Sequence, residues 1–142
     1  MSDNAAATIA RFGSPKAIRE QPDEEELECW GYVRGQRRAF NIEFRRLRGT
    51  WPALEYAWLH CPTWCPAPTS IGEGIEVPAA SIVLAYSTGH TVIISGRNLR
   101  EPYHRILEHQ VKYLAEADTP SADLADDEAV VVERVQIIEP KE

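Results

Sequence analysis

The stretch Ser81-Ile-Val-Leu-Ala-Tyr-Ser-Thr-Gly-His-Thr-Val-Ile-Ile-Ser-Gly96 decides the fold class. Its apolar runs, Ser81–Tyr86 and Thr91–Ser95, flank a turn-forming tetrapeptide, which is typical of a β-hairpin. After Gly96 the apolar spacing changes from two residues to about 3.6, which predicts an amphipathic helix. The apolar stripe of this helix comprises Leu99, Tyr103, Ile106, Leu107, Gln110, Val111 and Leu114. A chain that contains both periods belongs to the α+β class.

Further strands are expected on both sides of this stretch. In Arg38–Leu47 the residues Phe40, Ile42 and Phe44 alternate with polar ones, so we expect a half-buried strand with all three in the core. Ala53–Cys61 predicts a second strand paired with the first, and Val130–Ile138 predicts the last strand. Between them, residues 62–79 hold four prolines and two glycines, which predicts a long irregular loop.

These elements predict a mostly antiparallel sheet of about five strands, in the order β-β-β-β-α-β, covered by one amphipathic helix. A small curled barrel is the alternative. We place the start of the helix at Asn98, which forms a capping-box pattern with Glu101. The other choice is a start three residues later, with Pro102 as the first helical residue.

The charge is unevenly distributed along the 142 residues, which have the length of one domain. Residues 1–28 carry three basic and seven acidic side chains, residues 29–115 ten and six, and residues 116–142 two and nine. We therefore expect a flexible acidic N-terminal tail over 1–28, a core domain over 29–118, and an acidic linker with a C-terminal strand over 119–142.

Composition also limits the class of protein. Apolar residues make up 44% of the chain, which argues against global disorder, and no apolar run approaches the roughly 18 residues of a membrane helix. Three cysteines are too few for a disulfide scaffold, and the first residues show no secretory signal. We expect a soluble cytoplasmic protein that does not associate with membranes.

The first candidate site is the run His60-Cys61-Pro-Thr-Trp64-Cys65. His60, Cys61 and Cys65 could supply three zinc ligands, with Cys29 as a fourth, and Cys61 and Cys65 could instead form a redox-sensitive disulfide. The spacing differs from that of common zinc knuckles. The favoured interpretation is therefore structural, with both cysteines buried around Trp64 and no cofactor bound.

The second candidate is a basic cluster interleaved with aromatic residues, which is typical of single-stranded nucleic-acid or other anion binding. Its arginines are Arg34, Arg37, Arg38, Arg45, Arg46 and Arg48. The competing interpretation is an intramolecular match between these arginines and the acidic tails. A third candidate is an anion site at the expected strand–helix junction, formed by Arg97 and Arg100, against ordinary helix capping.

Catalysis has the least support, because none of the four histidines lies in a recognised nucleophile motif. No motif is specific enough to indicate a family. The preferred hypothesis is a binding protein whose target is another protein or its own copy, since Trp, Tyr and Arg dominate the energetic centres of interfaces. Trp51, Trp58 and Trp64 are the aromatic residues that motivate it. Nucleic-acid binding and a zinc or thiol site remain the alternatives.

Overall fold

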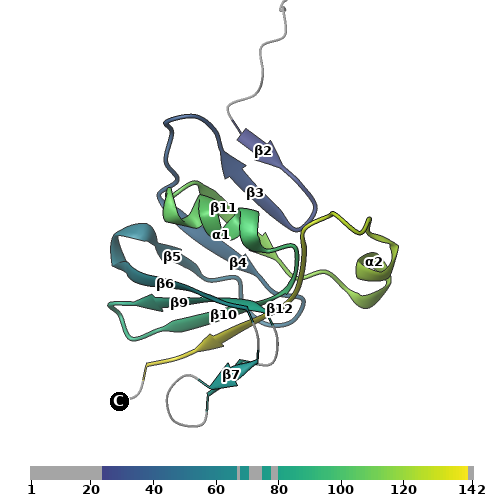
Figure 1. Ribbon diagram of the computed structural model, residues 1–142. Helices are drawn as coiled ribbons and strands as arrows, with labels where there is room; N and C mark the ends of the chain where they lie inside the picture. The colour runs from purple at the N-terminus through teal and green to yellow at the C-terminus, as the bar shows by residue number, and fades with distance from the viewer. Residues whose placement is uncertain (1–23, 67, 71–74, 78–79, 141–142) are drawn as a thin grey trace, which may run out of the picture.

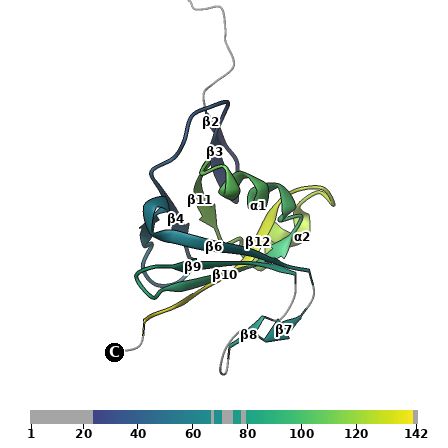
Figure 2. The same ribbon diagram turned by 60° about the vertical axis from the view of Figure 1, so that its left-hand side comes forward.

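The computed structural model describes residues 24–66, 68–70, 75–77 and 80–140. Most of its strands form two sheets, which Figures 1 and 2 show as two layers. The first sheet has the order β2-β3-β11-β4-β5 and is antiparallel except for the parallel pair β11–β4. Its strands are β2 (Glu24–Glu26), β3 (Trp30–Val33), β4 (Asn41–Arg45), β5 (Ala53–Glu55) and β11 (Val111–Ala115).

The second sheet is antiparallel throughout and has the order β12-β10-β9-β6. Its strands are β6 (Leu59–Cys65), β9 (Ser81–Tyr86), β10 (Thr91–Arg97) and β12 (Val131–Ile138). The predicted hairpin is confirmed as β9–β10, with Gly89 at a φ of 95° in its turn, and the predicted last strand is confirmed as β12. A short hairpin of β7 (Thr69–Ser70) and β8 (Glu76–Val77) projects beyond this sheet (Figure 2).

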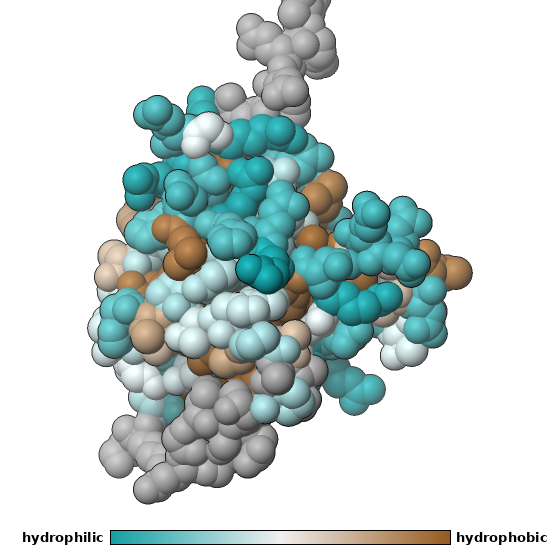
Figure 3. Space-filling model, in the orientation of Figure 1, coloured by the Kyte–Doolittle hydropathy of each residue, from teal (hydrophilic) through white to brown (hydrophobic). Residues whose placement is uncertain are grey.

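The main core lies between the two sheets. Alternation along the strands turns Ile42 and Phe44 of the first sheet and Ile82, Leu84 and Ile94 of the second into this layer, where all are essentially fully buried. The opposite face of the four-stranded sheet carries a smaller cluster with Val77 of the β7–β8 hairpin. The surface visible in Figure 3 is mostly hydrophilic over β2, β3 and α1 (Arg100–Leu107).

The α+β class is confirmed, whereas the single sheet with one helix is wrong in detail. The expected strand over 53–61 is split between the two sheets, because the 3-10 turn η1 (Tyr56–Trp58) carries the chain from β5 to β6. Two short helices occur among the described residues, α1 and α2 (Thr119–Leu124), the second of which lies inside the expected acidic linker. The strands described here do not close into a barrel, since each sheet ends in two edge strands.

The expected helix over 98–114 is also too long. After α1, His109 adopts a φ of 60°, its N–H donates to Ile106 O, and the Gln110 N–H donates to Arg105 O. This is a Schellman motif, which ends a helix and usually has glycine at the left-handed position. The residues that follow therefore form the strand β11. The helix begins at Arg100, and Asn98 does not cap it but lies at a φ of 60°.

The carboxylate of Glu116 links the two sheets at one corner. One oxygen accepts from the Leu47 N–H at 2.8 Å, just after β4, and the other accepts from the Val135 N–H of β12 at 2.6 Å. Glu116 also forms an isolated parallel bridge with Val132. In the part of the chain that the structure describes, no helix is long and apolar enough to cross a membrane.

Candidate functional site

The face of the five-stranded sheet that points away from the core carries a groove of about 640 Å³, here called the outer groove. It receives the residues that alternate with the core positions, such as Glu43 and Arg45 of β4 and Ala53 of β5. The residues that line it are Glu24, Glu26, Val33, Arg37, Arg38, Ala39, Phe40, Asn41, Glu43, Arg45, Ala53, Lys112 and Tyr113. Three of the predicted site arginines thus share one groove.

A bulge in β11 shapes the floor of the outer groove. The pairing of β11 with β3 shifts between Val111 and Tyr113. Val111 and Leu114 therefore both reach the core, while Lys112 and Tyr113 both line the groove. Adjacent strand residues otherwise point to opposite faces, so the bulge is what places an ammonium group beside a tyrosine here.

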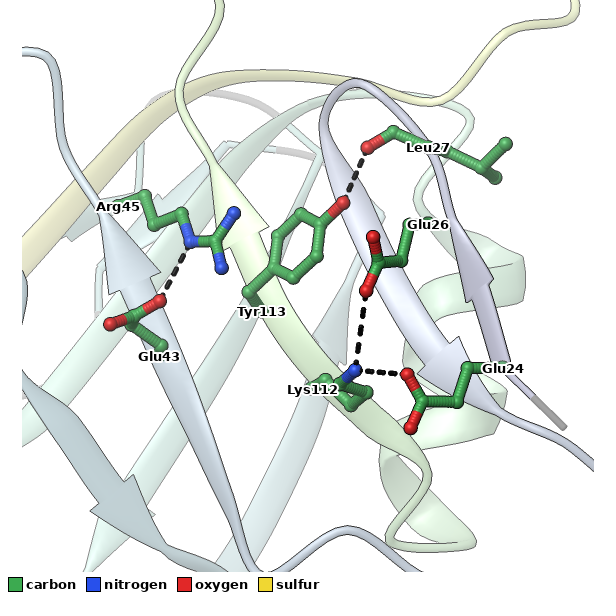
Figure 4. A network of polar contacts seen from close by, with 7 residues as sticks. All are labelled: Glu24, Glu26, Leu27, Glu43, Arg45, Lys112 and Tyr113. Carbon is green, nitrogen blue, oxygen red and sulfur yellow. Dashed lines mark hydrogen bonds and ion pairs between the residues drawn. The ribbon is translucent and has the colours of Figure 1, made fainter.

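The Tyr113 ring is held on three sides. It lies against Gly31 of β3, where a Cβ atom would sit 3.0 Å from both Cδ1 and Cζ. Its hydroxyl donates to Leu27 O at 2.6 Å, and the Arg45 guanidinium lies 3.8 Å from the ring centroid (Figure 4). Burial raises the pKa of Tyr113 above its ordinary value. The ring is consequently a fixed part of the floor.

Most charges on the floor are paired within the molecule. Lys112 bonds to Glu24 and lies 3.5 Å from Glu26, and the Arg45 Nε donates to Glu43 at 2.7 Å (Figure 4). The hydrogen bond to Glu24 is the main cause that raises the pKa of Lys112. These contacts also tie Glu24–Glu26, the end of the expected flexible tail, to the sheet as β2; residues 1–23 lie outside the described part.

One end of the outer groove is formed by the loop that carries Arg37 and Arg38. The buried side chain of Gln110 holds this loop by donating to Gly35 O at 2.7 Å, and the Ala39 N–H donates to His109 O at 2.7 Å. The Arg38 side chain is exposed and forms no ion pair with any described residue. Arg38 therefore adds to this end of the groove a positive charge that no described carboxylate pairs.

Three exposed aromatic residues lie on segments next to β5, and one of them, Phe40, lines the groove. Phe40 is 74% exposed, Trp51 is 55% exposed and Trp58 is 39% exposed. Phe40 was expected in the core, but it precedes the first residue of β4 and lies outside the alternating pattern. The Trp51 indole N–H donates to Arg46 O at 2.9 Å, which orients its ring near Arg45.

The remaining predicted arginines do not join this groove. Arg46 bonds to Thr50 in the turn before β5, and Arg48 is exposed in the same turn. Arg97 donates to Ala122 O, and the Arg100 guanidinium lies 5.8 Å from the centroid of the Trp64 ring. The predicted anion site at the start of α1 is therefore not assembled, because these two side chains engage different partners.

The predicted zinc ligands are also apart. Cys61 and Cys65 lie on the same extended strand, β6, four residues and therefore about 13 Å from each other. That separation exceeds the reach of a disulfide, and both are free thiols, Cys61 exposed and Cys65 buried. His60 is exposed, and Cys29 is buried in the main core. Among the residues described, no three His, Cys, Asp or Glu side chains form a group that could hold a metal ion.

The groove residues that sequence reasoning missed include Glu24, Glu26, Phe40 and Lys112. The acidic run Glu24–Glu26 carries no alternation that signals a strand, whereas the β-branched and aromatic residues next to Lys112 were a signal for one. No protein-family model, curated protein or solved structure compared with this chain matches it.

Proposed function

We propose that the protein binds another protein through the outer groove and the adjoining edge of β5, and that the partner contributes an extended segment with acidic residues. The observation that carries this proposal is that Phe40, 74% exposed, lines the outer groove together with Arg37 and Arg38, and that the exposed Trp51 lies near Arg45 of the same groove. Burying an aromatic side chain of this size is worth about 1.5–3 kcal/mol. A partner that covers them gains that free energy.

The backbone of β5 offers the hydrogen bonds for such a segment. Pro52 O accepts from the Phe44 N–H, and the Tyr56 N–H donates to Phe40 O, so these positions face β4. The alternate positions, Ala53 and Glu55, turn their backbone groups to the free edge. Strand addition uses such an edge for affinity and neighbouring side-chain contacts for specificity.

The charges favour a protein segment over a nucleic acid. Arg45 and Lys112 are already paired with carboxylates, and the three glutamates of the floor oppose a continuous polyanion. The Tyr113 ring is covered by Arg45, so it offers no free face on which a base could stack. A peptide can instead place its carboxylates at Arg38 and its apolar side chains at Phe40 and Trp51.

A titration followed by ¹H–¹⁵N NMR tests this proposal. The probe is an acetylated and amidated octapeptide that alternates valine or isoleucine with aspartate or glutamate; its controls carry lysine at the acidic positions or are a ten-residue oligothymidylate. We expect the acidic peptide alone to shift the resonances of residues 37–58. The double variant Phe40→Ser, Arg38→Glu should weaken this binding about tenfold or more.

The matched control variant is Leu124→Ser, Arg134→Glu, which changes an exposed leucine and an exposed arginine on other elements and should bind like the original chain. Binding of the oligonucleotide without the peptide would overturn the proposal in favour of a nucleic-acid partner. A concentration-dependent dimer that buries residues 37–58 and excludes the peptide would overturn it in favour of self-association. Absence of any shift at millimolar peptide would also refute it.

A further inference from the structure

A second cavity, of about 380 Å³, lies on the opposite side of β3 from the outer groove. Its deepest residues are Cys29, Trp30 and Tyr32, which are buried and belong to the main core. The Trp30 and Tyr32 rings are neighbours, with centroids 4.6 Å apart. The volume falls within the range of small-molecule sites, about 300–1,000 Å³, and the aromatic floor is typical of them.

The cavity exists because small residues face its floor. Ala117, Ala125 and Ala129 line it from the segment that contains α2, which Figure 1 shows beside the β2–β3 loop. This segment is anchored to the body of the protein. The Asn98 amide donates to Asp127 O at 2.7 Å and to Ala129 O at 2.8 Å, and Asp118 caps α2 by accepting from the Ser121 N–H at 2.8 Å.

The charged residues around the cavity all have one sign. Glu28, Glu101 and Glu128 line it and are exposed, so their carboxylates lie at its rim, and no described lysine, arginine or histidine lines it. Glu101 lies 3.6 Å from the Arg105 guanidinium, whereas Glu28 and Glu128 form no ion pair among the described residues. An apolar floor below an acidic rim is complementary to an apolar body that carries a cation.

We infer that this cavity binds a small organic ammonium ion, with its apolar body over Trp30 and its cationic group at the rim glutamates. The Arg105 guanidinium already lies 3.9 Å from the centroid of the Tyr32 ring, which leaves the carboxylates, rather than that ring, to hold the ligand's charge. An anionic ligand would meet three carboxylates, and no described lysine, arginine or histidine lines the cavity to balance them. A neutral ligand would gain the apolar contacts only. Selectivity for the cation is therefore the distinguishing property of this site.

The test compares three probes of similar size: 2-phenylethylammonium, 2-phenylethanol and phenylacetate, each titrated by ¹H–¹⁵N NMR. We expect the ammonium ion to shift the Trp30 indole and residues 117–131, and to bind about tenfold more tightly than the alcohol. The triple variant Glu28→Gln, Glu101→Gln, Glu128→Gln should abolish that preference without altering the fold, since all three side chains are exposed. Glu108→Gln, at the exposed C-cap of α1, is the control and should leave the preference for the ammonium ion intact.

A second variant, Ala125→Phe, should fill the cavity and weaken binding of all three probes. If Ala125→Phe fails to fold, the glutamine variant still decides the question. Equal affinity for the three probes, shifts confined to other residues, or no binding at millimolar concentration would each overturn the inference.

Discussion

Replacing Gly31 by alanine tests the packing that forms the floor of the outer groove. Alanine in a strand normally gains about 0.5–1 kcal/mol over glycine, because the unfolded chain loses less freedom. Here the new Cβ would overlap the Tyr113 ring, most closely at Cε1, and would lie 3.0 Å from its Cζ atom, which is shorter than van der Waals contact. The ring cannot move without loss, because its hydroxyl bonds to Leu27 O and Arg45 covers its face.

Overpacking of this kind costs about 1–3 kcal/mol, which exceeds the intrinsic gain. We therefore expect Gly31→Ala to lower the free energy of unfolding by about 1–2 kcal/mol. The assay is urea denaturation of Gly31→Ala, Tyr113→Ala and the double variant, with the m-value checked for constancy. In the Tyr113→Ala background, Gly31→Ala should become neutral or stabilising, which gives a coupling of about 1–3 kcal/mol. Additive effects would show that the Tyr113 ring does not explain the need for glycine.

Four further predictions concern the core and the anchoring contacts. Tyr56 donates to Val111 O at 2.9 Å, so Tyr56→Phe should lower the free energy of unfolding by about 1 kcal/mol at pH 7. The buried Tyr86 hydroxyl has no hydrogen-bond partner among the described residues, so Tyr86→Phe should leave the free energy of unfolding unchanged or raise it. Burial raises the pKa of both tyrosines above 10, so their contribution to stability is complete below about pH 10 and is lost as the pH rises further. Each Phe variant should therefore flatten the alkaline decline in the free energy of unfolding measured by urea titration. An unchanged decline would show that these tyrosines do not cause it. Glu116→Gln should lower the free energy of unfolding by about 1–3 kcal/mol, because one of two backbone N–H groups loses its acceptor, whereas Glu108→Gln should have no effect on the same denaturation curve. Asn98→Gly keeps the left-handed backbone but loses two hydrogen bonds, so hydrogen exchange over residues 118–130 should accelerate. Asn98→Ala should lower the free energy of unfolding by about 1–2 kcal/mol more than Asn98→Gly, because alanine is strained in a left-handed conformation. Equal stability of the two variants would refute strain at this position.

The local pattern was sufficient to predict the β9–β10 hairpin and β12, because strong alternation or apolar β-branched runs next to turn residues determine them. It was not sufficient at residues 108–114. There the helical stripe continues through Val111 and Leu114, and the stop at His109 uses a residue that is uncommon at a left-handed position. The choice between helix and strand at this point was made by pairing with β3 and β4, which are distant in sequence.

The outer groove was predictable only where a local sequence pattern marks its residues. Arg37, Arg38 and Arg45 stand out as a basic cluster, and the structure places them together. Lys112 falls outside the apolar stripe of the expected helix, and only the bulge in β11 turns it toward the glutamates of β2. Bulges and the close approach of a ring to Gly31 depend on tertiary pairing, which the sequence of a single segment does not contain.

The position of β11 has a bearing on how the chain acquires its structure. This strand lies between β3 and β4, yet it follows β4 by more than sixty residues. Until the ribosome has released Val111–Ala115, the hairpins β2–β3 and β4–β5 have no shared neighbour and remain two-stranded, a size that is marginally stable in water. The β9–β10 hairpin closes over a short loop and needs no later residue to pair. The four-stranded layer is thus the part that can begin to form during synthesis, and the groove-bearing layer is completed by a late insertion.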